Sequence, residues 1–284
     1  MAEVTDGVSV VIPAHEEGRV IDRCLNTLLR DARPGEFEVV VAANACTDDT
    51  VTKARAHGGD VTVLDLAGAG KAAALNEGDR VASRFPRIYL DADVDLCTDA
   101  ARGLADRLRV GDVHVVGPAL QPDFSGCSRW VRWYYDVWLA LPVMNDAYVG
   151  SGAFAVSREG HQRLLPFPSV VADDLYARRT FPSSQRATTR PGLVIHPPRN
   201  LRALVHRAVR VRAGNVALER SSVLETQDTV RGHRGLGAIA RELPARKLAV
   251  FVLVTAAVRV GVLHRSIRRR GAVWNRDESS RQSL

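Results

Sequence analysis

Short runs of aliphatic and β-branched residues alternate with longer stretches of mixed polarity from Val8 onward. The runs have the length of strands, and the stretches between them have the length of helices. The predicted strands are 8–13, 37–43, 61–66 and 87–92, and the predicted helices are 18–30, 49–57 and 71–84. Strands that alternate with helices predict an α/β fold with a mostly parallel sheet flanked by helices.

Beyond about residue 110 the pattern is mixed. It predicts a strand at 113–118, a helix rich in Trp and Tyr at 127–141, a turn and strand at 150–157, and a helix that Asp173 and Asp174 open. The last quarter of the chain is basic and is predicted to be mostly helical.

The glycine-containing segment Gly232–Gly237 is the predicted hinge before the last helix. We therefore expect one domain over residues 1–230, divided into halves at 8–110 and 111–230, and a basic, partly apolar helical extension over 231–284.

A polar cluster follows each of the first four predicted strands. The clusters are Pro13-Ala14-His15-Glu16-Glu17, Asn44-Ala45-Cys46-Thr47-Asp48-Asp49, Gly68-Ala69-Gly70-Lys71 and Asp91-Ala92-Asp93. Ligands of open α/β sheets bind beyond the carboxyl ends of the strands. The four clusters are therefore expected to converge on one ligand site.

Asp91 and Asp93 carry the strongest chemical signal. Two carboxylates two positions apart at a strand end can share Mg²⁺ or Mn²⁺ with a diphosphate. Acids that only cap the next helix are the alternative, and the neighbouring clusters favour the metal. Asp95 could replace either carboxylate. Lys71, at a predicted helix start, suits an anionic ligand, although a plain helix start with an exposed lysine shows the same pattern.

Glu16, Asp48 and Asp49 stand at the starts of predicted helices. For Asp49 a capping role is expected. Glu16 and Asp48 are predicted to contact the ligand, because each follows a strand at the converging edge.

These motifs, in this order over residues 8–95, resemble those of the family-two glycosyltransferases, which have a GT-A nucleotide-sugar-binding fold. VVIPAHEE is similar to the family's first strand, ANACTDDT to its Asp-Gly-Ser-x-Asp-x-Thr segment, GAGKAAALNEG to its Gly-Lys helix start, and YLDAD to its metal-binding DxD. GSGAFAVS and VADDLYARR continue the resemblance more thinly.

The resemblance implies a metal-dependent, inverting, non-processive transfer of a sugar from a nucleotide-diphosphate donor to an acceptor hydroxyl. The residues implied to bind the donor are Pro13, Ala14, Glu16, Asn44, Asp48, Lys71, Asn76 and Asp91. Asp91 and Asp93 are the implied ligands of Mg²⁺ or Mn²⁺, and Asp174 is the implied base, with Asp173 beside it.

The chain departs from the family pattern at three points. Asn44 stands where many members carry an acid, Asp173 replaces the commoner Glu, and the QxxRW motif of processive synthases is absent. In GT-A enzymes a late histidine sometimes completes the metal shell. His206 is the predicted candidate, ahead of His196, although both have a structural alternative.

Trp130, Tyr134 and Trp138 share one face of the predicted helix. Aromatic residues at this spacing are either core or a platform for the acceptor, and the pattern leaves both open. The acceptor is therefore predicted only as a small molecule or a lipid-linked compound.

The formal net charge is +7 and the excess of Arg and Lys is heaviest after about residue 178. Nucleic acid, anionic lipid and phosphorylated substrates all attract such a segment. No nucleic-acid recognition motif is present, so a nucleic-acid-binding protein is the weaker alternative and no nucleic acid is expected as partner. An acidic first segment without an apolar run predicts a cytoplasmic catalytic part.

The apolar segment 248–263 contains Arg259 and is flanked by basic residues. As a helix it covers roughly 24 Å, less than the roughly 30 Å of a bilayer core. It is therefore predicted to lie on an anionic membrane surface, at the inner face of the cell membrane, or to dock on the domain, rather than to span.

A sugar-phosphate nucleotidyltransferase is the alternative enzyme class, since it also combines an α/β sheet with metal-binding carboxylates. Such an enzyme would be expected to carry a Gly-rich, basic loop after the first strand. The acidic segment PAHEE occupies that position here.

Overall fold

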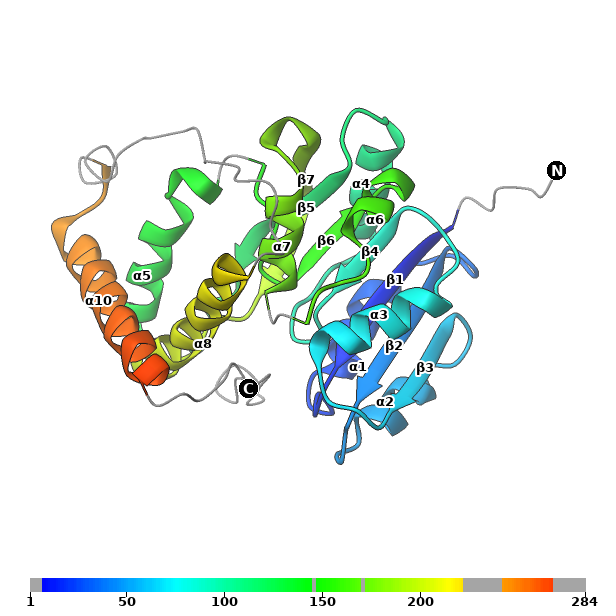
Figure 1. Cartoon of the computed structure of the whole chain (residues 1–284), viewed down its shortest axis with the longest axis horizontal. Coiled ribbons are helices and arrows are strands. Elements are labelled where there is room, and N and C mark those ends of the chain that lie inside the picture. The colour runs from blue at the N-terminus through cyan, green and yellow to red at the C-terminus, as the bar shows by residue number, and fades with distance from the viewer. Residues whose placement is uncertain (1–6, 145–146, 170–171, 222–241, 268–284) are drawn as a thin grey trace.

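The computed structural model describes residues 7–144, 147–169, 172–221 and 242–267. A seven-stranded sheet in the order β3-β2-β1-β4-β6-β5-β7 runs through it (Figure 1). The strands are β1 (Val8–Ala14), β2 (Phe37–Asn44), β3 (Val61–Leu66), β4 (Arg87–Leu90), β5 (Val115–Pro122), β6 (Ala153–Val156) and β7 (Arg186–Ile195). The four strands predicted in the first half are confirmed, and β4 ends just before the Asp91-Ala92-Asp93 segment.

The sheet is mixed, with β6 as its exception. Strands β3, β2, β1 and β4 are parallel, and Val11 of β1 is in register with Val40 of β2 and Tyr89 of β4. Strand β6 is antiparallel to both of its neighbours, while β5 and β7 are parallel to each other. Because β6 begins where β4 ends, residues 150–152 lie beside the DxD segment, and the Asp91 amide donates to the Gly152 carbonyl at 2.7 Å.

Helices cover both faces of the sheet (Figure 1). They are α1 (Ile21–Leu29), α2 (Thr50–Ala56), α3 (Lys71–Val81), α4 (Thr98–Arg109), α5 (Arg129–Leu139), α6 (Arg158–Leu164), α7 (Asp173–Thr180), α8 (Leu201–Arg220) and α10 (Ala245–Ile267). Successive strand residues point to opposite faces. Val10 and Ile12 pack in the cluster with α1 and α4, whereas Val11 packs in the cluster with α3 and α6.

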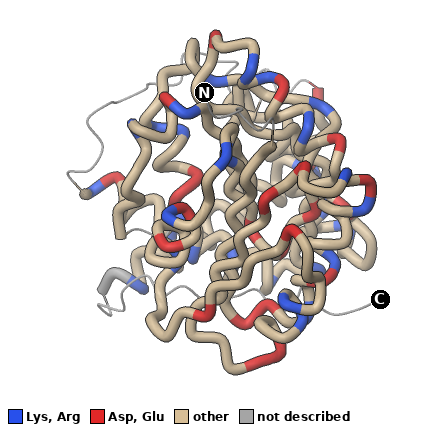
Figure 2. Tube along the Cα trace, turned by 90° about the vertical axis from the view of Figure 1, so that its right-hand side faces the viewer, with Lys and Arg blue, Asp and Glu red and all other residues tan. Residues whose placement is uncertain are grey.

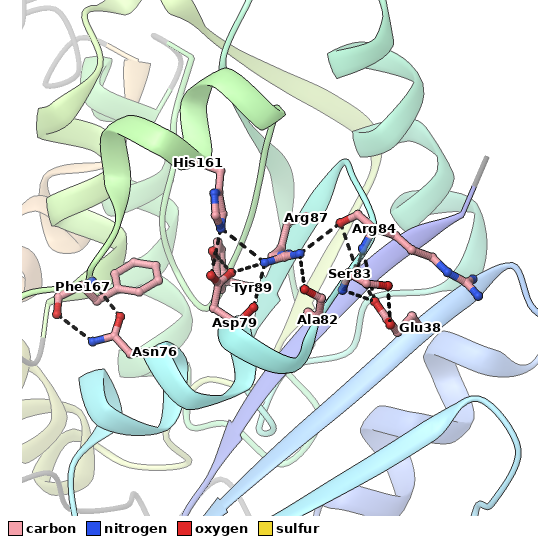
Figure 3. A network of polar contacts seen from close by, with 11 residues as sticks. Glu38, Asn76, Asp79, Ala82, Ser83, Arg84, Arg87, Tyr89, His161 and Phe167 are labelled. Atoms are coloured by element: carbon pink, nitrogen blue, oxygen red, sulfur yellow. Dashed lines mark hydrogen bonds and ion pairs between the residues drawn. The ribbon is translucent and has the colours of Figure 1, made fainter. Parts of the chain in front are cut away.

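A buried polar network fixes α3 to the sheet (Figure 3). The Asp79 carboxylate of α3 accepts hydrogen bonds from Arg87 and Tyr89 of β4, and His161 of α6 lies 2.8 Å from it. The side chains of Asp79 and Arg87 are 8% and 3% exposed, so this ion pair is shielded from water. Helix α3 carries Lys71 at its first position. The network therefore sets where that lysine stands relative to the end of β4.

Helices α5, α8 and α10 pack against one another beside the second half of the sheet. The rings of Tyr134 and Phe251 stack at 5.2 Å between centroids, and Lys247 pairs with Asp136 at 2.7 Å. A Cβ at Gly261 would lie 2.6 Å from Val209, so glycine is what lets α10 approach α8 this closely. The predicted alternative that the C-terminal helix docks on the domain agrees with this packing.

Helix α10 is longer than the predicted segment, and this corrects the length argument. Its 23 residues extend for roughly 34 Å, which is enough for a bilayer core. Among the described residues, Ala245–Arg265 has the length and composition of a membrane span, with 17% of its apolar window buried. Length and composition alone are weak evidence for a span, and one face of α10 is packed on protein. The predicted hinge and the boundary at 230 lie outside the described residues.

The net positive charge is not gathered on the face that Figure 2 presents. Basic and acidic positions are interspersed along the trace there. Among the described residues, most of the arginines that follow Arg178 are on α8 and α10, and several of them line the cleft described next.

Candidate active site

A cleft of about 660 Å³ opens beyond the carboxyl ends of β1 and β4. One wall comes from the strand ends and from the start of α7, and α5, α8 and α10 form the other. The predicted site residues that line the cleft are Pro13, Lys71, Asp91, Asp93, Asp173 and Asp174. Residues about 100 positions apart in the sequence thus meet at one edge of the sheet.

Lys71 links the DxD segment to the acidic pair of α7. Its Nζ lies 2.7 Å from Asp91 Oδ1 and 2.7 Å from Asp173 Oδ1. Burial lowers the pKa of Lys71, but the two carboxylates outweigh burial and raise it, so the ammonium stays charged. For the Asp91 carboxyl the effect of burial is the opposite, and burial is the main cause of its raised pKa. The negative charges of Asp173 and Asp93 raise this pKa further, and Lys71 lowers it.

The acidic residues of this wall fit a divalent cation. Asp91, Asp93, Asp173 and Asp174 line the same cleft, and Lys71 is the cation that pairs with two of them. The carboxylates therefore exceed the positive charge that Lys71 supplies. Within the described part of the chain, no three His, Cys, Asp or Glu side chains form a ready metal cage. Mg²⁺ typically takes one or two carboxylates and completes its shell with phosphate and water, which matches an Asp91/Asp93 site.

His206 does not join these carboxylates. It is exposed on α8 and is absent from the residues that line the cleft. The position of His206 in the sequence predicted a metal ligand. In the structure, its neighbours Leu204 and Arg207 on α8 line the cleft instead. The geometry gives the predicted role of His206 no support.

His196 and Asp95 are hydrogen-bonded to each other. His196 Nε2 lies 2.8 Å from Asp95 Oδ2, and Arg23 donates to Asp95 Oδ1 at 2.8 Å. Both carboxylate oxygens of Asp95 therefore have protein partners, which argues against Asp95 as a metal ligand in place of Asp91 or Asp93. Arg23 also donates to the Asp93 carbonyl at 3.3 Å, so this cluster fixes the loop that presents Asp93. This role of Arg23 was not predicted from the sequence, because no motif marks the residue.

Asp174 is positioned by the loop before β6. Its Oδ2 accepts a hydrogen bond from the Ser151 amide at 3.0 Å, and its Oδ1 accepts one from the Leu175 amide at 2.7 Å. Ser151 adopts φ 64° between Gly150 and Gly152, which also have positive φ. Asp174 is half-buried in the cleft, whereas Asp173 is buried and bound to Lys71. The two acids thus have different surroundings.

Asn44 and Asn76, two of the residues predicted to bind the nucleotide-sugar donor, use their side-chain amides to bind the protein backbone. Asn44 is fully buried; its Nδ2 donates to the Gly70 carbonyl at 2.8 Å, and its Oδ1 accepts from the Gly70 amide at 3.1 Å. Asn76 makes the same pair of bonds with Phe167, at 3.0 and 2.8 Å (Figure 3). Neither lines the cleft. Asn44 therefore sets the start of α3, and Asn76 fixes the segment at Phe167.

Glu16, Asp48 and Ala14 are also not among the residues that line the cleft. The Glu16 carboxylate accepts hydrogen bonds from the amide and hydroxyl of Thr47, which lowers its pKa. Asp48 accepts from the Gly18 amide at 3.0 Å. Ala14 is fully buried at the end of β1. These contacts tie the loops after β1 and β2 together, and the predicted contact of these residues with a donor stays a prediction.

The aromatic stripe of α5 is divided between core and cleft. Tyr134, Tyr135 and Trp138 line the cleft, while Trp130 is 39% exposed and packs edge-on against Trp133. Tyr135 is also buried in the core. Tyr134 and Trp138 pack against the core and also line the cleft, so a role as a platform for the acceptor stays a prediction.

An open α/β domain with paired carboxylates, a lysine and a further acid at the strand ends is the arrangement of a GT-A nucleotide-sugar-binding domain. Residues 9–147 match the model of the family described as Glycosyl transferase family 2. This match confirms the predicted resemblance over these residues, and the solved structures described next confirm the predicted GT-A fold.

Solved structures share this fold. The mannosyltransferase PcManGT from Pyrobaculum calidifontis, in complex with GDP-Man and Mn²⁺, has a TM-score of 0.63 at 24% identity, over 90% of this chain and 75% of that one. Glucosyl-3-phosphoglycerate synthase from Mycobacterium tuberculosis, with Mn²⁺, UDP and glucosyl-3-phosphoglycerate, has a TM-score of 0.54 at 20% identity, over 79% and 82%. At these identities the likeness shows the fold.

A sequence relative is the uncharacterized protein MT1568 of Mycobacterium tuberculosis (strain CDC 1551 / Oshkosh). It is 31% identical over 114 residues, which are 40% of this chain and 30% of that protein. The match thus spans less than a third of the relative's length.

Proposed function

We propose that this chain transfers a sugar from a nucleotide-diphosphate donor to an acceptor hydroxyl, with inversion at the anomeric carbon. The observation that carries the proposal is the pair of 2.7 Å contacts by which Lys71 joins Asp91 to Asp173, next to Asp174. The same cleft thus presents carboxylates for a metal and diphosphate and a separate carboxylate for an acceptor. The Mn²⁺ and nucleotide bound to the two structural neighbours support this assignment.

Asp91 and Asp93 would hold the cation and orient the donor. A bound Mg²⁺ or Mn²⁺ supplies positive charge that stabilises the departing nucleoside diphosphate. Lys71 keeps Asp91 and Asp173 in place and adds a cation beside the donor. Arg23 and Gly152, which bind the backbone of Asp93 and Asp91, keep the segment rigid.

Asp174 is the base. Its two backbone hydrogen bonds fix the carboxylate at the cleft, where it takes the proton of the acceptor hydroxyl. The acceptor oxygen attacks the anomeric carbon as the bond to the diphosphate breaks. A single displacement of this kind inverts the configuration at that carbon.

The donor site is tested by Asp93→Ala. The variant is expected to lose the Mn²⁺-dependent part of UDP or GDP binding and to keep its fold, because Asp93 is half-buried and lines the cleft. The measurement is the thermal shift that each nucleotide causes with and without Mn²⁺, since ligands that bind only the native state raise its stability. Asp99→Ala, a change at a carboxylate 73% exposed on α4, is the matched control. A variant that keeps the full Mn²⁺ effect would show that the carboxylate pair is misassigned.

We also propose that α10 rests on an anionic membrane at the cytoplasmic face. Val252, Leu253, Val260 and Leu263 are 60–69% exposed on the side away from the cleft. Exposed apolar residues that gather on one helix mark a candidate membrane contact, and Arg246 near the start of the helix is exposed for contact with anionic lipid.

The full-length protein is expected to sediment with phosphatidylglycerol vesicles and to be released as salt is raised, because salt screens exposed charges. Leu253→Glu with Val260→Glu should abolish the association, whereas Val110→Glu, at a position 70% exposed on the opposite part of the molecule, should not. Retention that resists salt and yields only to detergent would instead indicate a membrane span.

A further inference from the structure

Charge is divided between the two walls of the cleft. The acidic side chains come from the strand ends and the start of α7, and the arginines come from α8 and α10, except for Arg178, which follows the acids on α7. The acids are Glu17, Asp91, Asp93, Asp173 and Asp174, and the arginines are Arg178, Arg207, Arg210, Arg212 and Arg259. The acidic side chains are sufficient for the proposed binding of a metal and a donor. The arginines are not required for that binding.

Arg178 lies closest in the sequence to the proposed base. It stands four residues after Asp174 on α7, so the two side chains project from the same helix face. Its guanidinium lies 5.3 Å from the centre of the Tyr148 ring. The Tyr148 hydroxyl lies 3.1 Å from Ser151 Oγ, and the Ser151 amide binds Asp174. A cation thus borders the place where an acceptor hydroxyl meets its base.

Arg259 enters the cleft from the apolar helix α10. Phe251, Thr255 and Val258 line the cleft with it, and these positions share one helix face. Arg259 is exposed on this face and adds a positive charge to a lining from α10 that is otherwise uncharged. Arg207 joins it from α8 and donates to the His196 carbonyl at 3.2 Å, which places its guanidinium at the loop after β7.

An aromatic and apolar surface completes this wall. Tyr134 and Trp138 of α5 and Phe251 of α10 line the same cleft. The wall therefore offers arginines for an anion next to rings and aliphatic groups for an apolar body.

We propose that the acceptor carries a phosphate monoester, which Arg207 and Arg259 bind while its hydroxyl faces Asp174 and Arg178. This inference rests on the proposed function, because it concerns the acceptor of that transfer. Guanidinium groups match phosphate oxygens in geometry and remain charged at all physiological pH values. The phosphate is either that of a lipid or that of a water-soluble compound, and the aromatic surface favours the lipid.

The test measures binding to the full-length chain in EDTA, so that no metal contributes. The probes are decyl phosphate below its micellar concentration, sn-glycerol 3-phosphate, and neutral decyl glucoside, with affinity followed by tryptophan fluorescence or calorimetry. Decyl phosphate is expected to bind more tightly than decyl glucoside. Arg207→Gln and Arg259→Gln are each expected to weaken phosphate binding roughly tenfold, the effect of a lost charged hydrogen bond.

Each variant has a control on its own helix with the same charge change. Arg202→Gln on α8 and Arg265→Gln on α10 alter residues that do not line the cleft, and they should leave the affinity unchanged. If the controls weaken binding as much as the cleft variants, or if neither phosphate probe binds, the proposal is wrong. Tighter binding of decyl phosphate assigns the lipid source, and equal binding of glycerol phosphate assigns the soluble one.

Donor binding separates this proposal from the proposed function. If Arg207→Gln and Arg259→Gln reduce Mn²⁺-dependent UDP or GDP affinity and leave phosphate-probe affinity intact, the arginines serve the donor and the acceptor proposal is overturned. If no nucleotide binds with Mn²⁺ but decyl phosphate binds through the arginines, the transferase proposal fails and the phosphate site remains.

Discussion

Asp174→Asn is expected to lower turnover by roughly 10²–10⁴-fold, the usual contribution of a general base, while Mn²⁺-dependent donor affinity stays near that of the wild type. The substitution keeps the shape of the side chain and one acceptor oxygen, for the Ser151 amide; it loses the acceptor for the Leu175 amide and removes the basicity. Turnover is measured as release of nucleoside diphosphate, with the donor that thermal-shift screening identifies.

Asp173→Asn is the matched comparison, one residue away on the same helix. It removes the carboxylate that lies 2.7 Å from Lys71, so we expect weaker donor binding and a lower melting temperature rather than a selective loss of turnover. If Asp173→Asn instead gives the larger loss of turnover with donor affinity unchanged, the roles of the two acids must be exchanged.

The first half of the domain, residues 8–110, could be predicted because its signals are local. Buried parallel strands need continuous apolar runs such as Val8–Ala14, and chemistry at a sheet edge needs polar residues directly after them. Asp91, Asp93 and Lys71 follow this rule and line the cleft, as expected from their positions after the strands. Their roles in binding metal and donor remain predictions.

Motif position alone does not tell whether a polar side chain faces a ligand or a backbone. Asn76 binds Phe167, which lies 91 residues away, and Asn44 binds Gly70, 26 residues away. An amide that offers one donor and one acceptor satisfies a backbone segment as well as it would a ligand. The choice depends on tertiary contacts that no local pattern records.

The second half of the domain, residues 111–230, and the helix that follows it have few local signals for the same reason. The antiparallel direction of β6, which brings Gly152 beside Asp91, follows from strand order and not from composition. In the sequence, Arg259 is the one charged residue in the apolar segment 248–263. In the structure it lies in the cleft, because α10 folds back onto α5 and α8.

The largest expected effect on folding comes from Asp79→Asn. The substitution leaves the Arg87 guanidinium, whose side chain is 3% exposed, without its counter-charge. Removal of one partner of a buried ion pair lowers the free energy of unfolding by about 3–5 kcal/mol, and each kcal/mol lowers Tm by roughly 2–4 °C. Glu77→Gln on the same helix is the control, because the Glu77–Arg80 pair is exposed and contributes about 0–1 kcal/mol.

The pH dependence of this effect provides a second measurement. Burial raises the pKa of Asp79, but hydrogen bonds from His161, Arg87 and Tyr89 outweigh burial, so the pKa lies below its usual value. A carboxyl with a lowered pKa contributes stability that is present above its unfolded pKa and is lost as the pH falls through its folded pKa. The difference in Tm between the wild type and Asp79→Asn should therefore be full at neutral pH and shrink in acid. A difference that stays constant down to the acid limit would show that Asp79 contributes through shape and hydrogen bonding rather than through its charge.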